Sequence, residues 1–334
     1  MSFDEEEYKR SFSINIWKKL NPFLKQYKLY FICAILANLF VAFVDVMFPI
    51  FQKYAIDNFI TPMSTKGINN FVIVYILAIV LQVIFVIIFT RLSMYLEMNI
   101  GKDLKRATFM HLQKLSFSYY NTTPVGYIIA RVMSDTNKIG SMVAWGLVDL
   151  FWSITYVLGV FIAMFMLNAK LAMYVIAIVP FIAILTVYFQ NKILNVNRDV
   201  RKINSKITGA FNEGITGSIT SKTLVIEDKN LEDFSKITDK MYKTSIRATK
   251  LNAIYMPIIL FFSSLAVAFV LDRGGNLVIN DLMEIGTLSA FISYAISIFE
   301  PIQQLAKNIS EFIATQANIE RVFGLLERTP DIVD

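Results

Sequence analysis

The stretch FVIVYILAIVLQVIFVIIFTRLSMYLEMNIGKDLKRATFMHLQKL, residues 71–115, decides the fold. Residues 71–89 carry no charge and come close to the roughly 20 residues that a helix needs to cross a hydrocarbon core. From residue 91 onward apolar side chains recur at helical spacing without a proline, which predicts that the helix continues. At about 1.5 Å per residue, the whole stretch would be roughly 68 Å long, more than twice the bilayer core. We expect a membrane-spanning helix that projects about 30 Å or more into the cytoplasm.

Five further apolar runs accompany this one. They cover residues 29–51, 140–167, 171–189, 254–271 and 285–305. The composition is 55% hydrophobic and 17% charged, whereas ordinary soluble domains carry about 25% charged residues. The apolar residues lie in continuous runs and not at alternate positions, which excludes a membrane β-barrel. The sequence therefore predicts an all-α membrane protein with six transmembrane helices.

Positive charge is concentrated before the first run, in the two long connections, and after the sixth run. These segments hold 28 of the 32 lysines and arginines, and the other connections hold only Lys53, Lys66, Lys170 and Arg273. Because positively charged segments tend to stay in the cytoplasm, we expect both termini and both long connections on that side. This topology accounts for the net charge of +6 without nucleic acid as a partner.

The segments outside the spans have helical patterns of their own. Residues 1–28 lack a secretory signal, and their apolar residues recur at helical spacing, which indicates an amphipathic helix in the lipid headgroup plane or else a loose basic tail. Within the predicted transmembrane domain, residues 29–310, the connections at about 90–140 and 190–252 each contain a helix, a break and a returning helix. The second break is expected at residues 212–221, and residues 311–334 are expected to form an exit helix and linker. Two helical hairpins therefore carry short tips into the cytoplasm.

The residues of these hairpins resemble a known family. LQKLSFSYYNTTPVGYIIARVMSDTNKIG, residues 112–140, is similar to the first intracellular hairpin of ATP-binding-cassette exporters, with an aromatic turn, Pro-x-Gly and Arg-x-x-x-Asp. ITGAFNEGITGSITSKTLVIEDKNLEDF, residues 207–234, resembles the second hairpin, and FEPIQQLAKNISEFIATQANIERVFGLLE, residues 299–327, resembles the sixth span and its exit. VAWGLVDLFWS, residues 143–153, resembles the Gram-positive multidrug branch. The resemblance covers nearly the whole chain.

This resemblance implies a homodimer or heterodimer in a bacterial plasma membrane, with twelve helices around a substrate path. The hairpin tips would dock on nucleotide-binding domains that hold ATP and Mg²⁺, and the second tip would cross to the opposite subunit. A short turn on a stiff hairpin suits that task, because force at the tip moves a long lever with little bending. The coupling residues implied are Phe117, Ser118, Tyr119, Tyr120, Asn212, Glu213, Gly214, Thr216 and Ser218.

The sequence through Asp334 contains no phosphate-binding loop. The nearest match, residues 216–223, ends in Ser-Lys-Thr, but Thr216 and Ser221 occupy the positions that require glycine, and the segment follows a helix and not a strand. The chain thus resembles a transmembrane domain alone, whose ATPase domain is fused to it or separate. With Cys33 and His111 as its only cysteine and histidine, the sequence offers no metal or catalytic constellation, so we expect no cofactor and no enzymatic activity in this chain itself.

Polar side chains within the spans are candidates for a substrate cavity. Ionisable groups cost about 2.5–3.5 kcal/mol at the membrane centre, so they need water or protein partners. Asp45, Gln82, Asp149, Trp152 and Glu300 would line a cavity that attracts a small cationic amphiphile, with aromatic faces for cation–π contacts. The alternative is that these side chains form hydrogen bonds between helices or lie near the water boundary.

Two other functions remain open at this point. An ion-coupled secondary transporter would use the membrane carboxylates without an ATPase, although the sequence shows no pair of broken helices with inverted symmetry. A membrane scaffold that transports nothing would need no cavity. Access of water-soluble reagents to the membrane carboxylates would distinguish a cavity from a scaffold.

Overall fold

The computed structural model describes residues 13–329. Within this range the chain is almost entirely helical and has no strand, which confirms the predicted all-α class. Six helical segments are long and apolar enough to cross a membrane: Asn21–Ile60, Ile68–Leu112, Val125–Leu167, Ala169–Thr216, Glu227–Ile279 and Ile285–Leu326. They contain 40 to 53 residues, about twice the length that a bilayer core requires. All six therefore extend beyond the membrane, which the sequence predicted in detail for the second.

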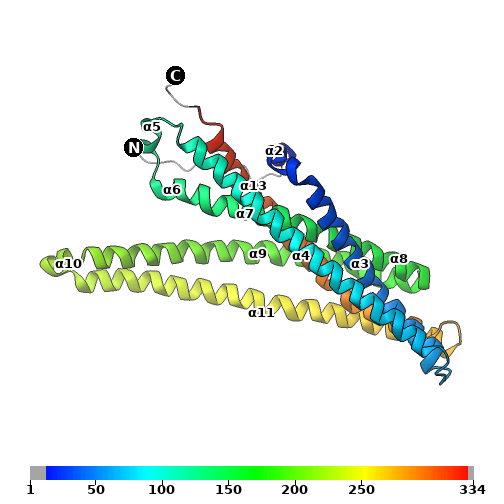
Figure 1. Ribbon diagram of the computed structural model, residues 1–334. Helices are drawn as coiled ribbons and strands as arrows, with labels where there is room; N and C mark the ends of the chain where they lie inside the picture. The colour runs from blue at the N-terminus through cyan, green and yellow to red at the C-terminus, as the bar shows by residue number, and fades with distance from the viewer. Residues whose placement is uncertain (1–12, 330–334) are drawn as a thin grey trace. The chain divides into compact units, whose positions relative to one another are not determined.

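The elements follow one another in a simple order (Figure 1). They are α1 (Ile14–Lys18), α2 (Asn21–Leu24), η1 (Lys25–Tyr27), α3 (Lys28–Ala55), η2 (Ile56–Ile60), α4 (Ile68–Leu112), α5 (Phe117–Thr122), α6 (Val125–Ile129), η3 (Ala130–Asp135), α7 (Thr136–Ser141), η4 (Met142–Gly146), α8 (Leu147–Leu167), α9 (Ala169–Thr216), α10 (Ser218–Leu224), α11 (Glu227–Ile279), α12 (Ile285–Ser297) and α13 (Phe299–Leu326).

The chain divides into two compact units. The first contains the described residues up to Tyr174 and from Phe269 onward, and the second is Val175–Ala268. In the first unit α3 lies centrally and contacts α4, α8 and α12. Small residues permit this close packing: a Cβ added at Gly159 of α8 would lie 2.9 Å from a methyl carbon of Val46 in α3. Glycine at such positions lets membrane helices approach closely.

The N-terminal helices pack onto this unit. Leu20 is completely buried in a core cluster with residues of α4, α7 and α13, among them Leu96, Ile100, Leu104, Ile139, Ile319 and Val322. The indole ring of Trp17 stacks on Phe312, with ring centroids 3.8 Å apart. We expected the apolar face of this segment at the lipid headgroups. The side chain of Leu20 instead packs on apolar residues of α4, α7 and α13.

A network of polar contacts joins the end of α3 and η2 to the start of α12. The backbone N–H of Gly286 donates to Asp57 Oδ1 at 2.7 Å, which satisfies one of the free N–H groups in the first turn of α12. Lys53 Nζ contacts Asp57 Oδ2 at 2.8 Å and also binds the carboxylate of Glu284. A side chain at Gly286 would collide with Asp57, so the contact depends on glycine.

The second unit is a long helical hairpin. Parts of α9 and α11 run side by side and meet at the short helix α10 (Figure 1). The rings of Phe211 and Phe234 pack edge to face near the tip, with centroids 5.4 Å apart. This is the helical hairpin expected from the sequence, but the break between its two long helices covers residues 217–226 and is shifted from the predicted residues 212–221. Helix α9 continues to Thr216, and the chain turns at Gly217 and again at Val225, where φ is 54°.

Candidate functional site

Three of the five proposed cavity residues meet around one carboxylate in the membrane. Gln82 of α4 donates to Asp45 Oδ1 of α3 at 2.6 Å, and the indole N–H of Trp152 in α8 donates to Asp45 Oδ2 at 3.3 Å. Both carboxylate oxygens of Asp45 therefore have protein partners. This geometry favours the alternative stated above, in which Asp45 and Gln82 bind helices together.

The same polar cluster extends toward α12. The ring of Trp152 stacks on Tyr156, with centroids 5.5 Å apart and an interplanar angle of 22°. The hydroxyl of Tyr156 donates to Ser297 Oγ at 2.9 Å, and the buried hydroxyl of Tyr294 donates to the carbonyl of Val46 at 2.7 Å. Side chains from α3, α4, α8 and α12 are thus connected in the membrane. Such a network fixes the helices relative to one another.

Asp149 and Glu300 lie outside this hydrogen-bonded cluster. Asp149 is half-buried on α8, and the nearest cation that acts on it is Lys307 of α13. Glu300 lies in the first turn of α13, and its side chain is exposed on the surface of the unit. An exposed carboxylate inside an apolar span requires water or a second polypeptide chain. Of the five candidates, Glu300 has the position that best suits a water-filled cavity.

The first hairpin tip consists of α5 and the turn before α6. Phe117 is 89% exposed, whereas Tyr119 is buried against Leu112, Ile128 and Leu325. The hydroxyl of Tyr120 donates to the Leu112 carbonyl at 2.6 Å. Burial raises the pKa of the Tyr119 hydroxyl, so this ring stays neutral at physiological pH. Tyr119 and Tyr120 therefore hold the tip on the unit, and Phe117 points outward from it.

A buried ion pair behind this tip was not recognised from the sequence. Arg321 of α13 binds Asp135 of η3 through two hydrogen bonds, Nε to Oδ2 at 2.8 Å and Nη2 to Oδ1 at 2.9 Å. The guanidinium of the buried Arg131 lies 3.6 Å from the ring centroid of Tyr127. Arg131 and Asp135 are the ends of the Arg-x-x-x-Asp motif. The sequence did contain a signal for such contacts, since Arg131 and Asp135 are charged residues at helical spacing in an otherwise apolar stretch.

The second hairpin tip presents apolar side chains to solvent. Asn212, Glu213, Gly214, Thr216 and Ser218, the predicted coupling residues, are exposed at the end of α9 and the start of α10. Sequence reasoning missed their apolar neighbours Ile215, Ile219, Leu224 and Val225, which are 62–81% exposed. Exposed apolar side chains grouped at a tip are typical of a contact surface for another protein.

Comparison with known proteins defines the class of this fold and site. The model of the family described as the ABC transporter transmembrane region matches residues 31–302, most of the chain. The chain therefore belongs to this family and is a membrane-spanning domain of an ABC transporter. This confirms the resemblance drawn from the hairpin residues and disfavours both alternatives.

The relatives compared here are distant. YknV of Bacillus subtilis, an uncharacterised ABC transporter ATP-binding protein, is 24% identical over 279 residues, which cover 84% of this chain and 46% of YknV. YgaD of the same organism, provisionally assigned to multidrug export, is 24% identical over 320 residues, covering 94% of this chain and 55% of YgaD. The ATP-dependent lipid A-core flippase of Desulfotalea psychrophila is 27% identical over 273 residues, covering 78% of this chain and 47% of the flippase. The chain spans about half the length of the curated relatives it matches.

Proposed function

We propose that this chain is the membrane-spanning half of an ATP-driven exporter. Two such domains would enclose the substrate path, with both termini and both hairpin tips in the cytoplasm. Nucleotide-binding domains, either fused to this chain or on separate subunits, would hold ATP and Mg²⁺ and would bind the hairpin tips. The chain itself then needs no nucleotide site, and alone it should release phosphate from ATP only at background rates.

The observation that carries this proposal is the construction of the first tip. Tyr119 and Tyr120 attach α5 to the unit, the Arg321–Asp135 pair joins the returning helix to α13, and Phe117 projects outward. A rigidly supported, exposed aromatic residue suits a docking contact, because little conformational entropy is lost on binding. A movement of the docked partner would then be transmitted to α4, η3 and α13 together.

Support for a cationic substrate comes from Glu300. Its carboxylate is exposed on the surface of the unit, in the first turn of α13. A cavity shared by two domains would hydrate this carboxylate and would favour a positively charged amphiphile. We assign Asp45, Gln82 and Trp152 to the hydrogen-bonded support of that cavity and not to its lining. Asp149 remains a candidate lining residue.

Substitution of Phe117 tests the docking role in the transporter assembled with its ATPase domains. Loss of an anchor residue at a protein interface costs about 2 kcal/mol, or roughly 30-fold in affinity. We expect Phe117→Ala to lower substrate transport into vesicles and to uncouple ATP hydrolysis from it. Phe109→Ala is the matched control, because Phe109 is also exposed but belongs to α4 and not to α5. Equal transport by the two variants at matched expression would refute the docking role of Phe117.

A further inference from the structure

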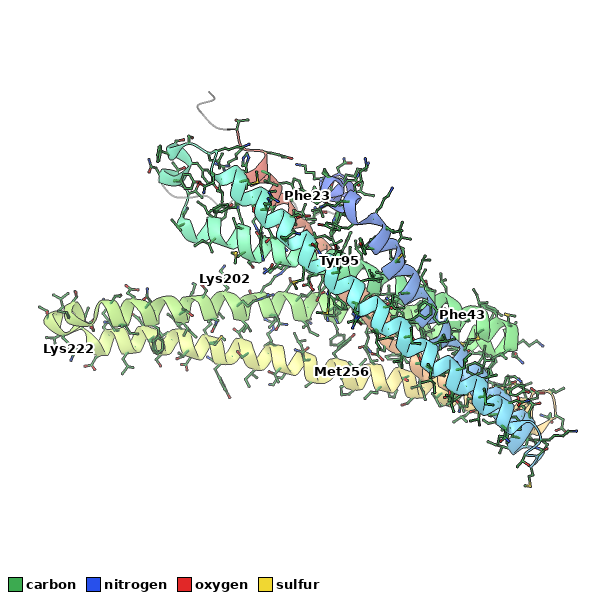
Figure 2. The ribbon with its side chains drawn as sticks, viewed as in Figure 1. Phe23, Phe43, Tyr95, Lys202, Lys222 and Met256 are labelled. Atoms are coloured by element: carbon green, nitrogen blue, oxygen red, sulfur yellow. The ribbon has the colours of Figure 1, made fainter. Side chains whose placement is uncertain are left out.

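A cleft of about 700 Å³ opens between α9 and α11 in the second unit. Its walls carry six basic side chains, Lys202, Lys206, Lys236, Lys240, Lys243 and Arg247, and one acidic residue, Asp199. Figure 2 labels Lys202, which lies on α9 within this stretch, and Lys222 at the hairpin tip. We call this feature the basic cleft. None of the coupling or cavity residues considered above belongs to it.

The spacing of the residues explains how the basic cleft forms. Val196 and Ile203 of α9 are seven residues apart and buried, and with Ile237 of α11 they form an apolar floor. The four cations of α11 are separated by four, three and four residues, so they share one face of the helix. The hairpin therefore has an apolar seam flanked by charged positions, as in an antiparallel coiled coil.

The charges that flank this seam differ from those of an ordinary coiled coil. In coiled coils such positions commonly pair opposite charges across the two helices. Within the described residues, no ion pair joins α9 to α11, and the carboxylates that bind Lys236, those of Glu232 and Asp233, lie on its own helix. Lysines of the two helices instead face a common space. Like charges brought together in this way repel one another, and a bound anion would relieve that repulsion.

The size and chemistry of the basic cleft favour a phosphate compound. Its volume lies within the range of about 300–1,000 Å³ that is usual for small-molecule sites. Phosphate oxygens accept charge-assisted hydrogen bonds from ammonium and guanidinium groups, and a ligand with several phosphates could engage both helices at once. A single carboxylate or chloride would reach only one or two of the cations.

The distance from the apolar spans argues for a soluble ligand. Arg247 precedes the apolar run that begins at residue 254 by seven residues, about 10 Å along a helix, and Lys236 precedes it by about 27 Å. The headgroup layer is only about 5–8 Å thick on each side of the hydrocarbon core. Lipid phosphates could therefore approach Arg247 at most, whereas the basic cleft extends well beyond them.

We propose that the basic cleft between α9 and α11 is a binding site for a soluble ligand with several phosphate groups. The bound ligand would join the two helices and stiffen the hairpin that carries the second tip. This assignment goes beyond the exporter function, because it concerns a site outside both the substrate path and the docking contacts.

Binding of inorganic tripolyphosphate to the purified full chain in detergent tests the proposal. Calorimetry should show saturable binding at physiological salt, and each lost charge-assisted contact should weaken it about tenfold. We expect Lys240→Gln with Lys243→Gln to weaken binding at least tenfold, and Lys240→Arg with Lys243→Arg to retain it. The matched control is Lys222→Gln with Lys229→Gln, which removes two lysines of the same hairpin outside the basic cleft.

Several outcomes would overturn the proposal. One is the absence of saturable binding to the wild type, and another is an equal loss in the cleft and control variants, since that would indicate nonspecific charge attraction. Displacement of tripolyphosphate by vesicles of phosphatidylglycerol, but not by free pyrophosphate, would assign the basic cleft to lipid headgroups. Protection of residues 196–206 and 236–247 from hydrogen exchange is the supporting result. Because no step requires ATP hydrolysis or transport, failure here leaves the exporter proposal untouched.

Discussion

Replacement of Asp135 by Asn tests the support of the first hairpin directly. The Asp135 side chain is 6% exposed and that of Arg321 is 25% exposed, and two hydrogen bonds of 2.8 and 2.9 Å join them. Asparagine has nearly the same shape but no charge, and it offers one acceptor atom where aspartate offers two. The substitution therefore leaves the guanidinium of Arg321 partly buried without its counter-charge.

The expected loss of stability follows from that burial. Removal of one partner of a fully buried ion pair costs about 3–5 kcal/mol. Arg321 retains some water contact and a hydrogen bond to Asn318, so we expect a smaller loss, about 2–3 kcal/mol. At about 2.1 cal/mol/K per residue, the unfolding entropy of a chain of 334 residues is about 0.7 kcal/mol/K. The variant should therefore melt about 3–4 °C below the wild type.

Thermal unfolding of the purified chain in detergent, followed by tryptophan fluorescence, measures this effect. The matched control is Glu327→Gln, which removes the charge of the exposed pair between Glu327 and Lys19, 2.6 Å apart and 56% and 41% exposed. Exposed pairs contribute about 0–1 kcal/mol, so the control should shift the melting temperature little. A double-mutant cycle with Arg321→Gln should give a coupling free energy of at least about 1 kcal/mol. If Asp135→Asn melts no lower than Glu327→Gln, the ion pair does not support the hairpin.

Two further substitutions address the substrate path and the packing at the start of α12. Glu300→Gln keeps the side-chain shape and removes the charge. Transport of a cationic substrate should therefore fall, while transport of a neutral substrate of equal size should be little affected. Equal losses for both substrates would show that Glu300 does not line the cavity. Gly286→Ala should destabilise the chain by about 1–3 kcal/mol, because its Cβ would lie 2.6 Å from the Asp57 carboxyl carbon and would also collide with the Lys53 carbonyl. Gly275→Ala, at a position with open space, is its control in thermal unfolding and should be neutral or stabilising.

The sequence predicted the architecture well because long apolar runs and helical spacing are local signals. Residues 71–89 and their continuation predicted a helix that the structure gives as Ile68–Leu112. Pro124 likewise indicated the turn between α5 and α6, although Gly126, also expected in this break, lies within α6. These predictions needed no knowledge of which helices touch.

Such local signals could not predict which groups the polar side chains contact. Asp45 and Glu300 looked alike in the sequence, since each is a carboxylate within an apolar run. Only the packing of α3 against α4 and α8 brings Gln82 and Trp152 to Asp45, whereas the side chain of Glu300 is exposed and has no hydrogen bond within residues 13–329. The burial of Leu20 could not be predicted for the same reason, because the residues that pack against it lie far away in the chain.

The polar residues of the first unit therefore have two different roles. Those with complete hydrogen bonding, such as Asp45 and the Arg321–Asp135 pair, resist relative movement of the helices that they join. The proposed coupling to a docked ATPase would need such rigid groups, because a flexible lever would absorb a displacement applied at Phe117. Glu300, whose carboxylate is exposed within an apolar span, is stabilised only when water or a ligand reaches it. Rigid support and an exposed carboxylate together would suit the proposed substrate path with changing access.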